Sequence, residues 1–123
     1  MNISTRAVVL EQPERLSLHD LDMAAPQDDD VVVDVEWSGI STGTERLLWS
    51  GRMPHFPGMG YPLVPGYETV GTVVRAGPEA GDMAVGSTVF VPGSYSFQGA
   101  RNLFGGAGAR LIVPNERVVP VSA

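Results

Sequence analysis

The stretch that decides the fold is VVVDVEWSGISTGTE, residues 31–45, which joins a strong strand pattern to a segment dense in small hydroxyl residues. In its first half, apolar residues recur at every second position from Val31 to Trp37, with Asp34 and Glu36 between them. Because side chains of a strand alternate between its two faces, this pattern predicts a half-buried strand. We expect Trp37 to share the buried face with the valines.

The second half of the stretch leads into a short helix. Residues 42–49 read TGTERLLW and contain no proline. They predict about two helical turns. Thr42 or Thr44 is expected to cap this helix, since a side-chain oxygen there can accept a hydrogen bond from a free backbone N–H group. Leu47 and Leu48 are expected to pack inward.

Six further strand patterns surround this stretch. Alternating runs at residues 6–10 and 15–20 predict a hairpin. The run at 67–76 contains Gly71, which indicates a bulge or a close approach of two backbones. The 15 glycines and 10 prolines disfavour long helices. Without any alternation of strands and helices, a mainly β barrel or sandwich is expected. The remaining patterns cover 87–91, 107–113 and 117–121.

Composition excludes several classes of chemistry. The chain has 123 residues, which fits one domain, and its net charge of −6 argues against a nucleic-acid partner. It has no cysteine, so disulfides, thiolate nucleophiles and cysteine-ligated metals are excluded. All eight basic residues are arginine, which excludes lysine chemistry. No apolar run is long enough to span a membrane, and no signal-peptide core is present, so a cytoplasmic protein is expected.

Four motifs follow one another in an order typical of one family. They are GISTGTE at 39–45, VPGYETVGTVV at 64–74, VGSTVFVPG at 85–93 and GGAGARLIVPNERVVPV at 105–121. Together they resemble the N-terminal catalytic domain of the medium-chain dehydrogenase/reductase superfamily. The resemblance covers nearly the whole chain. It implies a GroES-like, partly open β-barrel with one or two short helices, formed by residues 1–123.

Within that superfamily, residues 38–68 resemble the bacteriochlorophyllide a dehydrogenases of bacteriochlorophyll biosynthesis. Those enzymes use NAD to oxidise a 3-(1-hydroxyethyl) group on a tetrapyrrole to acetyl. The resemblance implies a tetrapyrrole substrate and a place at the periphery of the photosynthetic membrane. NAD would bind to a Rossmann domain, and GGAGA at 105–109 lacks the spacing of a dinucleotide motif. We therefore expect a catalytic-domain fragment that is inactive alone and holds no cofactor-binding residue.

Two other functions remain open at this stage. One is a quinone or enoyl reductase of the same superfamily, which would also work without zinc. The other is a stand-alone GroES-like co-chaperonin or binding module, which the GISTGTE and GYE motifs disfavour. Open edges of the barrel would also permit a homodimer.

The expected site is metal-free. The resemblance places Ser41 and Tyr67 where zinc-dependent relatives have a cysteine and a histidine ligand. A hydroxyl and a phenol are poor ligands for Zn²⁺, and only Glu68 remains as a good one.

Four residues are candidates for moving the proton of the alcohol. Tyr67 can exchange that proton directly, and Glu68 can orient Tyr67 or act as the base. Ser41 and Thr44 can form a short relay, with Thr42 as the alternative relay position. In the simpler interpretation, Tyr67 is a core residue and the hydroxyls only cap the helix.

The loop that follows the predicted helix carries the candidate substrate-binding residues. Its apolar and aromatic side chains predict a surface for a flat, hydrophobic ligand. His55 could bind the central Mg²⁺ or a propionate of a tetrapyrrole. The alternative is that these residues cover one end of the barrel and that His55 is solvated. The candidates, together with Thr42, are Trp49, Met53, His55, Phe56, Met59 and Tyr61.

Overall fold

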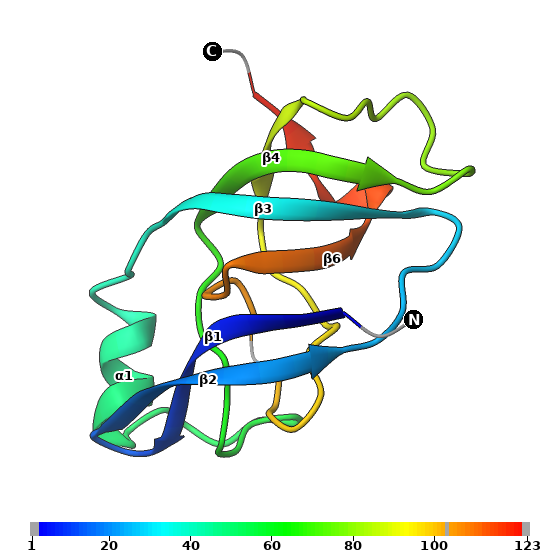
Figure 1. The fold of residues 1–123 in the computed structure, drawn as a ribbon. Helices are drawn as coiled ribbons and strands as arrows, with labels where there is room; N and C mark the ends of the chain where they lie inside the picture. Colours follow the sequence, from blue (N-terminus) through cyan, green and yellow to red (C-terminus); the bar gives the residue numbers. More distant parts are fainter. Residues whose placement is uncertain (1–2, 103, 122–123) are drawn as a thin grey trace.

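The computed structural model describes residues 3–102 and 104–121, which form a two-stranded hairpin, a five-stranded sheet and one short α-helix (Figure 1). Strand order in the larger sheet is β6-β3-β4-β5-β7. Within the described residues, none of the strand ladders closes the two sheets into a full barrel. The mainly β, partly open fold with a short helix is therefore confirmed. The elements are β1 (Ile3–Gln12), β2 (Arg15–Met23), β3 (Asp30–Ser38), α1 (Thr44–Ser50), β4 (Thr69–Ala76), β5 (Thr88–Val91), β6 (Arg110–Pro114), a 3₁₀ turn (Asn115–Arg117) and β7 (Val119–Pro120).

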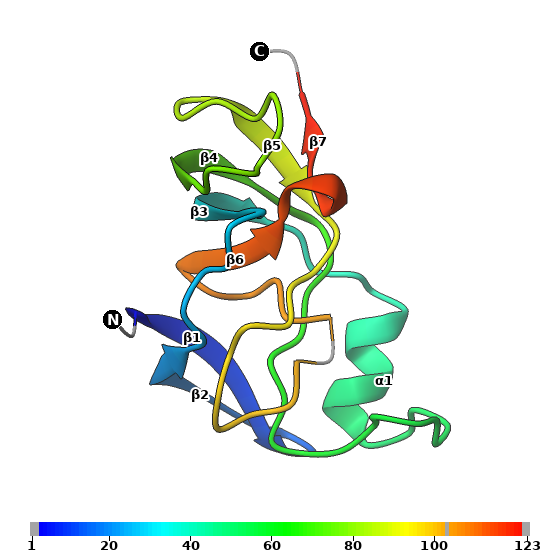
Figure 2. The same ribbon diagram turned by 90° about the vertical axis from the view of Figure 1, so that its right-hand side faces the viewer.

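The two sheets lie one above the other, and α1 stands to their side (Figure 2). The main core between the sheets is built largely from small and β-branched side chains, including Val31, Val33 and Ile112. Burial of such apolar surface is the main force that holds the sheets together. Among the described residues, no helix has the length and apolar character needed to cross a membrane.

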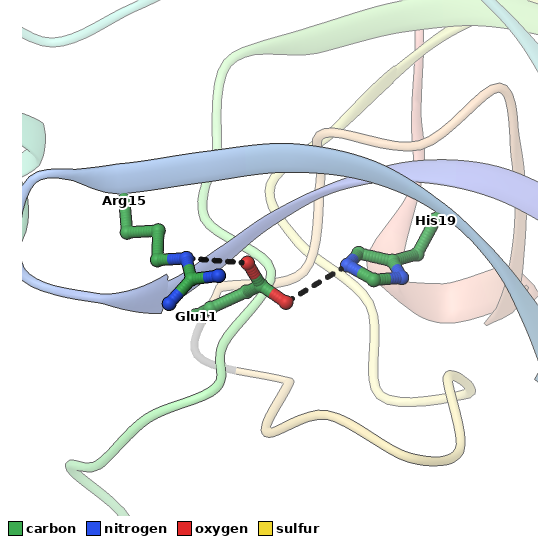
Figure 3. Close-up of polar contacts among 3 residues, drawn as sticks. All are labelled: Glu11, Arg15 and His19. Atoms are coloured by element: carbon green, nitrogen blue, oxygen red, sulfur yellow. Dashed lines mark hydrogen bonds and ion pairs between the residues drawn. The ribbon is translucent and has the colours of Figure 1, made fainter.

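The N-terminal hairpin confirms the predicted pairing and extends it at both ends. Strands β1 and β2 pair from Ile3–Met23 to Gln12–Arg15, with an irregularity near the turn. Beside the turn, the Glu11 carboxylate contacts the Arg15 guanidinium at 3.4 Å and the His19 ring at 3.2 Å (Figure 3). These groups are partly exposed, so their contribution to stability is small.

Strand β3 differs from the simple alternation that its sequence predicts. Val35 pairs with Gly71, but the next pair joins Trp37 to Val70, so one extra residue is accommodated in β3. Such a bulge shifts the alternation by one position. Trp37 therefore lies on the face opposite Val35 and is 75% exposed. The expectation that Trp37 is buried with the valines is wrong for this reason.

Gly71 marks the close approach of β3 and β4 that the sequence indicated. A Cβ atom at this position would lie 2.7 Å from the Val33 Cγ1 atom and closer still to the Asp34 carbonyl oxygen. Both atoms belong to the facing strand, which is held by the sheet on both sides. Only glycine fits between the strands here.

A second, smaller core lies where α1 packs against β1 and the segment at Leu63. Leu10 of β1, Leu48 of α1 and Leu63 are buried together. Leu47, in contrast, is exposed, so only one of the two leucines expected to pack inward does so. This small core fixes α1 against the turn end of the hairpin. The side chains packed around it are Met53, Phe56, Met59, Tyr61 and Phe104.

Candidate functional site

An apolar groove of about 930 Å³ runs between the N-terminal hairpin and α1. Its volume lies within the range of about 300–1,000 Å³ that is usual for ligand sites. Its walls come from both hairpin strands, from the segment between β3 and α1, and from the start of α1. The lining residues are Arg6, Ala7, Val8, Leu10, Leu16, Leu18, Ser38, Gly39, Ile40, Ser41, Thr42, Glu45, Arg46, Leu48, Trp49, Pro65, Gly66, Ala107, Gly108 and Ala109.

The floor of the groove is backbone that pairs with β1. The Val8 amide donates to the Ala107 carbonyl at 2.8 Å, and the Ala109 amide donates to the Arg6 carbonyl at 2.8 Å. Between them, Gly108 lies so close to Phe97 that a Cβ atom would be 2.6 Å from the ring. The floor is therefore tightly packed, and its polar groups are already hydrogen-bonded to one another.

The rim of the groove exposes large apolar side chains. Leu18 on β2 is 64% exposed, and Ile40, in the segment before α1, is 80% exposed. Leu16 and Trp49 are also exposed. Apolar side chains gathered at the mouth of a groove indicate a binding surface. Sequence reasoning predicted the hairpin but missed this role, although the alternation of Leu16 and Leu18 in β2 was visible.

At the start of α1, the side chain that accepts a free backbone N–H group is that of Ser41 rather than that of either threonine. The Thr44 amide donates to the Ser41 Oγ atom at 3.2 Å, and the Ser41 amide donates to the Glu45 Oε2 atom at 2.7 Å. The two bonds resemble a reciprocal capping arrangement, which satisfies two free N–H groups. Gly43 takes the N-cap position, and no side chain caps there. The expectation that Thr42 or Thr44 caps the helix is wrong, because Ser41 does so.

Glu45 is a site residue that sequence reasoning missed. It lines the groove, and burial raises the pKa of its carboxyl above the ordinary value. The hydrogen bond from the Ser41 amide opposes this rise, whereas the negative charge of Glu68 adds to it. The signal in the sequence was a glutamate four residues after a serine at a helix start.

Tyr67 and Glu68 lie just before β4. The Tyr67 ring is half-buried and meets the Phe104 ring edge to face, with centroids 5.1 Å apart. The Glu68 side chain lies against Gly39, whose amide donates to the Glu68 carbonyl at 2.7 Å. The structure thus brings Glu68 close to the segment before α1, where Ser41 lies, and Thr44 is the first residue of α1. Tyr67 and Glu68 do not line the groove.

The loop after α1 turns much of its apolar surface inward. Met53, Phe56, Met59 and Tyr61 are partly buried around the small core, whereas His55 is exposed. Of the candidate substrate-binding residues, only Thr42 and Trp49 line the groove.

Tyr61 has a clear structural contact that gives a testable prediction. Its hydroxyl donates to the Leu48 carbonyl at 2.6 Å, near the end of α1, and burial raises the pKa of this hydroxyl. Tyr61→Phe should lower the free energy of unfolding by about 1 kcal/mol, the usual contribution of one hydrogen bond. Chemical denaturation measures this loss. Tyr95→Phe, at an exposed tyrosine outside the small core, serves as the control. Equal stabilities of the protein and the Tyr61→Phe variant would contradict the assignment.

The residues at the expected zinc-ligand positions have other roles in the structure. The Ser41 hydroxyl accepts a helix N–H group, and the Tyr67 ring packs against Phe104. Among the described residues, no group of three or more histidine, aspartate or glutamate side chains is placed to hold a metal ion. Ser41 and Tyr67 offer a hydroxyl and a phenol, which are poor ligands for Zn²⁺.

Comparisons with known proteins point to one family. The alcohol dehydrogenase GroES-like domain matches residues 27–123. The 2-desacetyl-2-hydroxyethyl bacteriochlorophyllide A dehydrogenase of Rhodobacter capsulatus is 50% identical over 117 residues, which is 94% of this chain and 37% of that protein. The protein of the same name from Cereibacter sphaeroides is 49% identical over 122 residues, covering 95% and 38%.

Among solved structures, CAD from Helicobacter pylori complexed with NADP(H) superimposes with a TM-score of 0.79. The match covers 99% of this chain and 42% of that one at 18% sequence identity, so it supports the fold alone. The chain thus spans well under half the length of each of these relatives.

Proposed function

The chain belongs to the alcohol dehydrogenase GroES-like domain family, and we propose that it is the substrate domain of an NAD-dependent enzyme that oxidises the hydroxyethyl group of a bacteriochlorophyllide to acetyl. The observation that carries this proposal is the 50% identity to the Rhodobacter capsulatus dehydrogenase over 94% of the chain. An apolar groove beside a hydroxyl-bearing helix start supports it. We assign residues 1–123 to this domain and assign no NAD-binding residue within them.

The chemistry requires a hydride and a proton to leave the substrate by different routes. When bound, NAD⁺ supplies the acceptor for the hydride from the alcohol carbon. The hydroxyl proton passes to a protein group, and the C–O bond becomes a carbonyl. We propose Tyr67 as that group, with Glu68 as its partner and Ser41 or Thr44 as a relay. Supporting this, Glu68 lies against Gly39, two residues before Ser41.

We propose that no zinc takes part in the reaction. A zinc-dependent alcohol dehydrogenase polarises the alcohol oxygen with a metal held by thiolate, imidazole or carboxylate groups. Here Ser41 and Tyr67 offer a hydroxyl and a phenol, and the Ser41 oxygen already accepts the Thr44 amide. Proton transfer by side chains replaces metal activation in this proposal.

The partners and location follow from the same proposal. We propose that the tetrapyrrole is the partner and that the enzyme works in the cytoplasm, near the photosynthetic membrane. A homodimer through the outer edge of β2 is a further part of the proposal. Its support is the outer edge of β2, which bonds residues 96–98 only at its end near Met23 and has no partner strand over Arg15–Leu21 among the described residues.

An activity assay on the full-length protein tests the function and the absence of zinc together. The protein is stripped with a chelator, its zinc content is measured, and it is then supplied with the hydroxyethyl macrocycle and NAD. We expect NADH and the acetyl product in equal amounts from protein holding well under one zinc per chain. Loss of activity on chelation with recovery on adding zinc would contradict the zinc-free mechanism. Reduction of an activated double bond by NADPH, without oxidation of the hydroxyethyl group, would favour the reductase alternative.

A further inference from the structure

The charged residues that line the apolar groove are mostly basic, although the whole chain is acidic. The whole chain has 14 acidic and 8 basic residues. Yet the groove is lined by two arginines, Arg6 and Arg46, and by one carboxylate, Glu45. Positive charge beside an apolar wall favours a ligand that is both hydrophobic and anionic.

Two of these three charges already have partners. The Arg6 Nε atom lies 3.3 Å from the Asp20 Oδ1 atom across the hairpin. The Glu45 carboxylate accepts the Ser41 amide at 2.7 Å. Arg46 has no hydrogen bond or ion pair to any of the residues that the structure describes. Its guanidinium is therefore the group best placed to meet an anion from outside.

Arg46 also has a suitable neighbour on α1. Trp49 follows it by three residues, and side chains at this spacing lie on the same face of a helix. Both line the groove, opposite the exposed leucines of β2. The helix face thus offers a flat aromatic surface beside a cation that can bind a carboxylate through two parallel N–H groups.

We propose that Arg46 binds the carboxylate of the macrocyclic substrate in this groove, while Trp49, Ile40 and Leu18 hold the flat ring. This inference rests on the proposed function and adds to it a residue that orients the substrate. A bacteriochlorophyllide carries a propionic acid side chain on an otherwise hydrophobic ring. Arg46 fixes the direction in which that ring enters the groove, and so which edge of the ring faces Ser41.

The test compares two macrocycles that differ in one charge. The full-length protein and its Arg46→Gln variant are assayed with the free acid and with the methyl ester of the propionate. For the acid, we expect the variant to raise KM about 10- to 100-fold, the usual size of a charged hydrogen bond, with kcat nearly unchanged. For the ester, the two proteins should have similar KM values. Titration of the visible absorption of the acid without NAD should give the same loss of affinity.

Two further variants separate recognition from general effects. Arg75→Gln removes the same charge from an exposed position on β4 outside the groove and should leave KM for the acid unchanged. Arg46→Lys keeps the charge and should restore part of the affinity. Equal losses for acid and ester, or an unchanged KM for the acid in Arg46→Gln, would overturn the inference and leave the proposed function standing. Failure of the unmodified protein to oxidise either macrocycle would overturn the proposed function and this inference with it.

Discussion

Tyr67→Phe is expected to lower kcat for alcohol oxidation in the full-length protein by about 10²–10⁴-fold, the range for a lost acid–base group, with little change in KM. The substitution removes only the hydroxyl and keeps the ring that packs edge to face on Phe104. The hydroxyl has no hydrogen-bond partner among the described residues, so its removal should not weaken the fold. Steady-state kinetics and thermal unfolding of the same samples measure both effects.

Two further variants show whether the loss of kcat is specific to Tyr67. Tyr95→Phe deletes a hydroxyl from an exposed tyrosine whose ring lies under the Arg117 guanidinium, and it should leave kcat unchanged. Glu68→Gln removes the proposed partner of Tyr67. A near-normal kcat in Tyr67→Phe together with a large loss in Glu68→Gln would move proton transfer to Glu68 and show the assignment of Tyr67 to be wrong.

Gly71→Ala is expected to lower the free energy of unfolding by about 1–3 kcal/mol, because it forces a methyl group into a well-packed interior. The new Cβ atom would lie 2.7 Å from Val33 Cγ1 and nearer still to the Asp34 carbonyl oxygen. The carbonyl belongs to the backbone of the central strand β3, which pairs on both sides. Relief would require β3 and β4 to move apart. Chemical denaturation followed by circular dichroism measures the loss.

Gly43→Ala provides the control for this substitution. A Cβ atom there would have the Ser41 Oγ atom as its nearest neighbour at 3.9 Å, and the backbone φ of −85° suits alanine. Its stability should change by less than about 1 kcal/mol, as for most surface substitutions. Equal effects of the two variants would mean that the close approach at Gly71 has been misjudged.

Sequence reasoning was most successful where a local pattern has one physical meaning. Alternating apolar residues predicted the hairpin and β3, and the glycine within a strand pattern predicted the close approach at Gly71. The order of the motifs identified the family. The strand signals are carried by neighbouring residues, and pairing with β4 changed only the end of β3 at Trp37.

The errors arose where contacts distant in sequence decide the outcome. The bulge that moves Trp37 to the outer face depends on how β3 pairs with β4. Leu18 of the hairpin lines the same groove as Ile40 and Trp49, and no local pattern in the sequence predicts that these residues lie close together. The loop after α1 showed an apolar composition, but composition could not reveal that Met53 and Phe56 turn toward a small core.

The bulge in β3 decides which side chains reach the mouth of the groove, because it sets which residues of β3 lie opposite those of β4. With the extra residue, Ser38 pairs with the buried Thr69 and lines the groove, whereas Trp37 faces outward. If β3 paired without the bulge, Glu36 would lie opposite Val70 and Trp37 opposite Thr69, which would bring an indole to where a serine now lies. A deletion and a substitution at Glu36 are therefore different kinds of change, since only the deletion would remove the extra residue, and it would leave Trp37 opposite Val70 and Ser38 opposite Thr69.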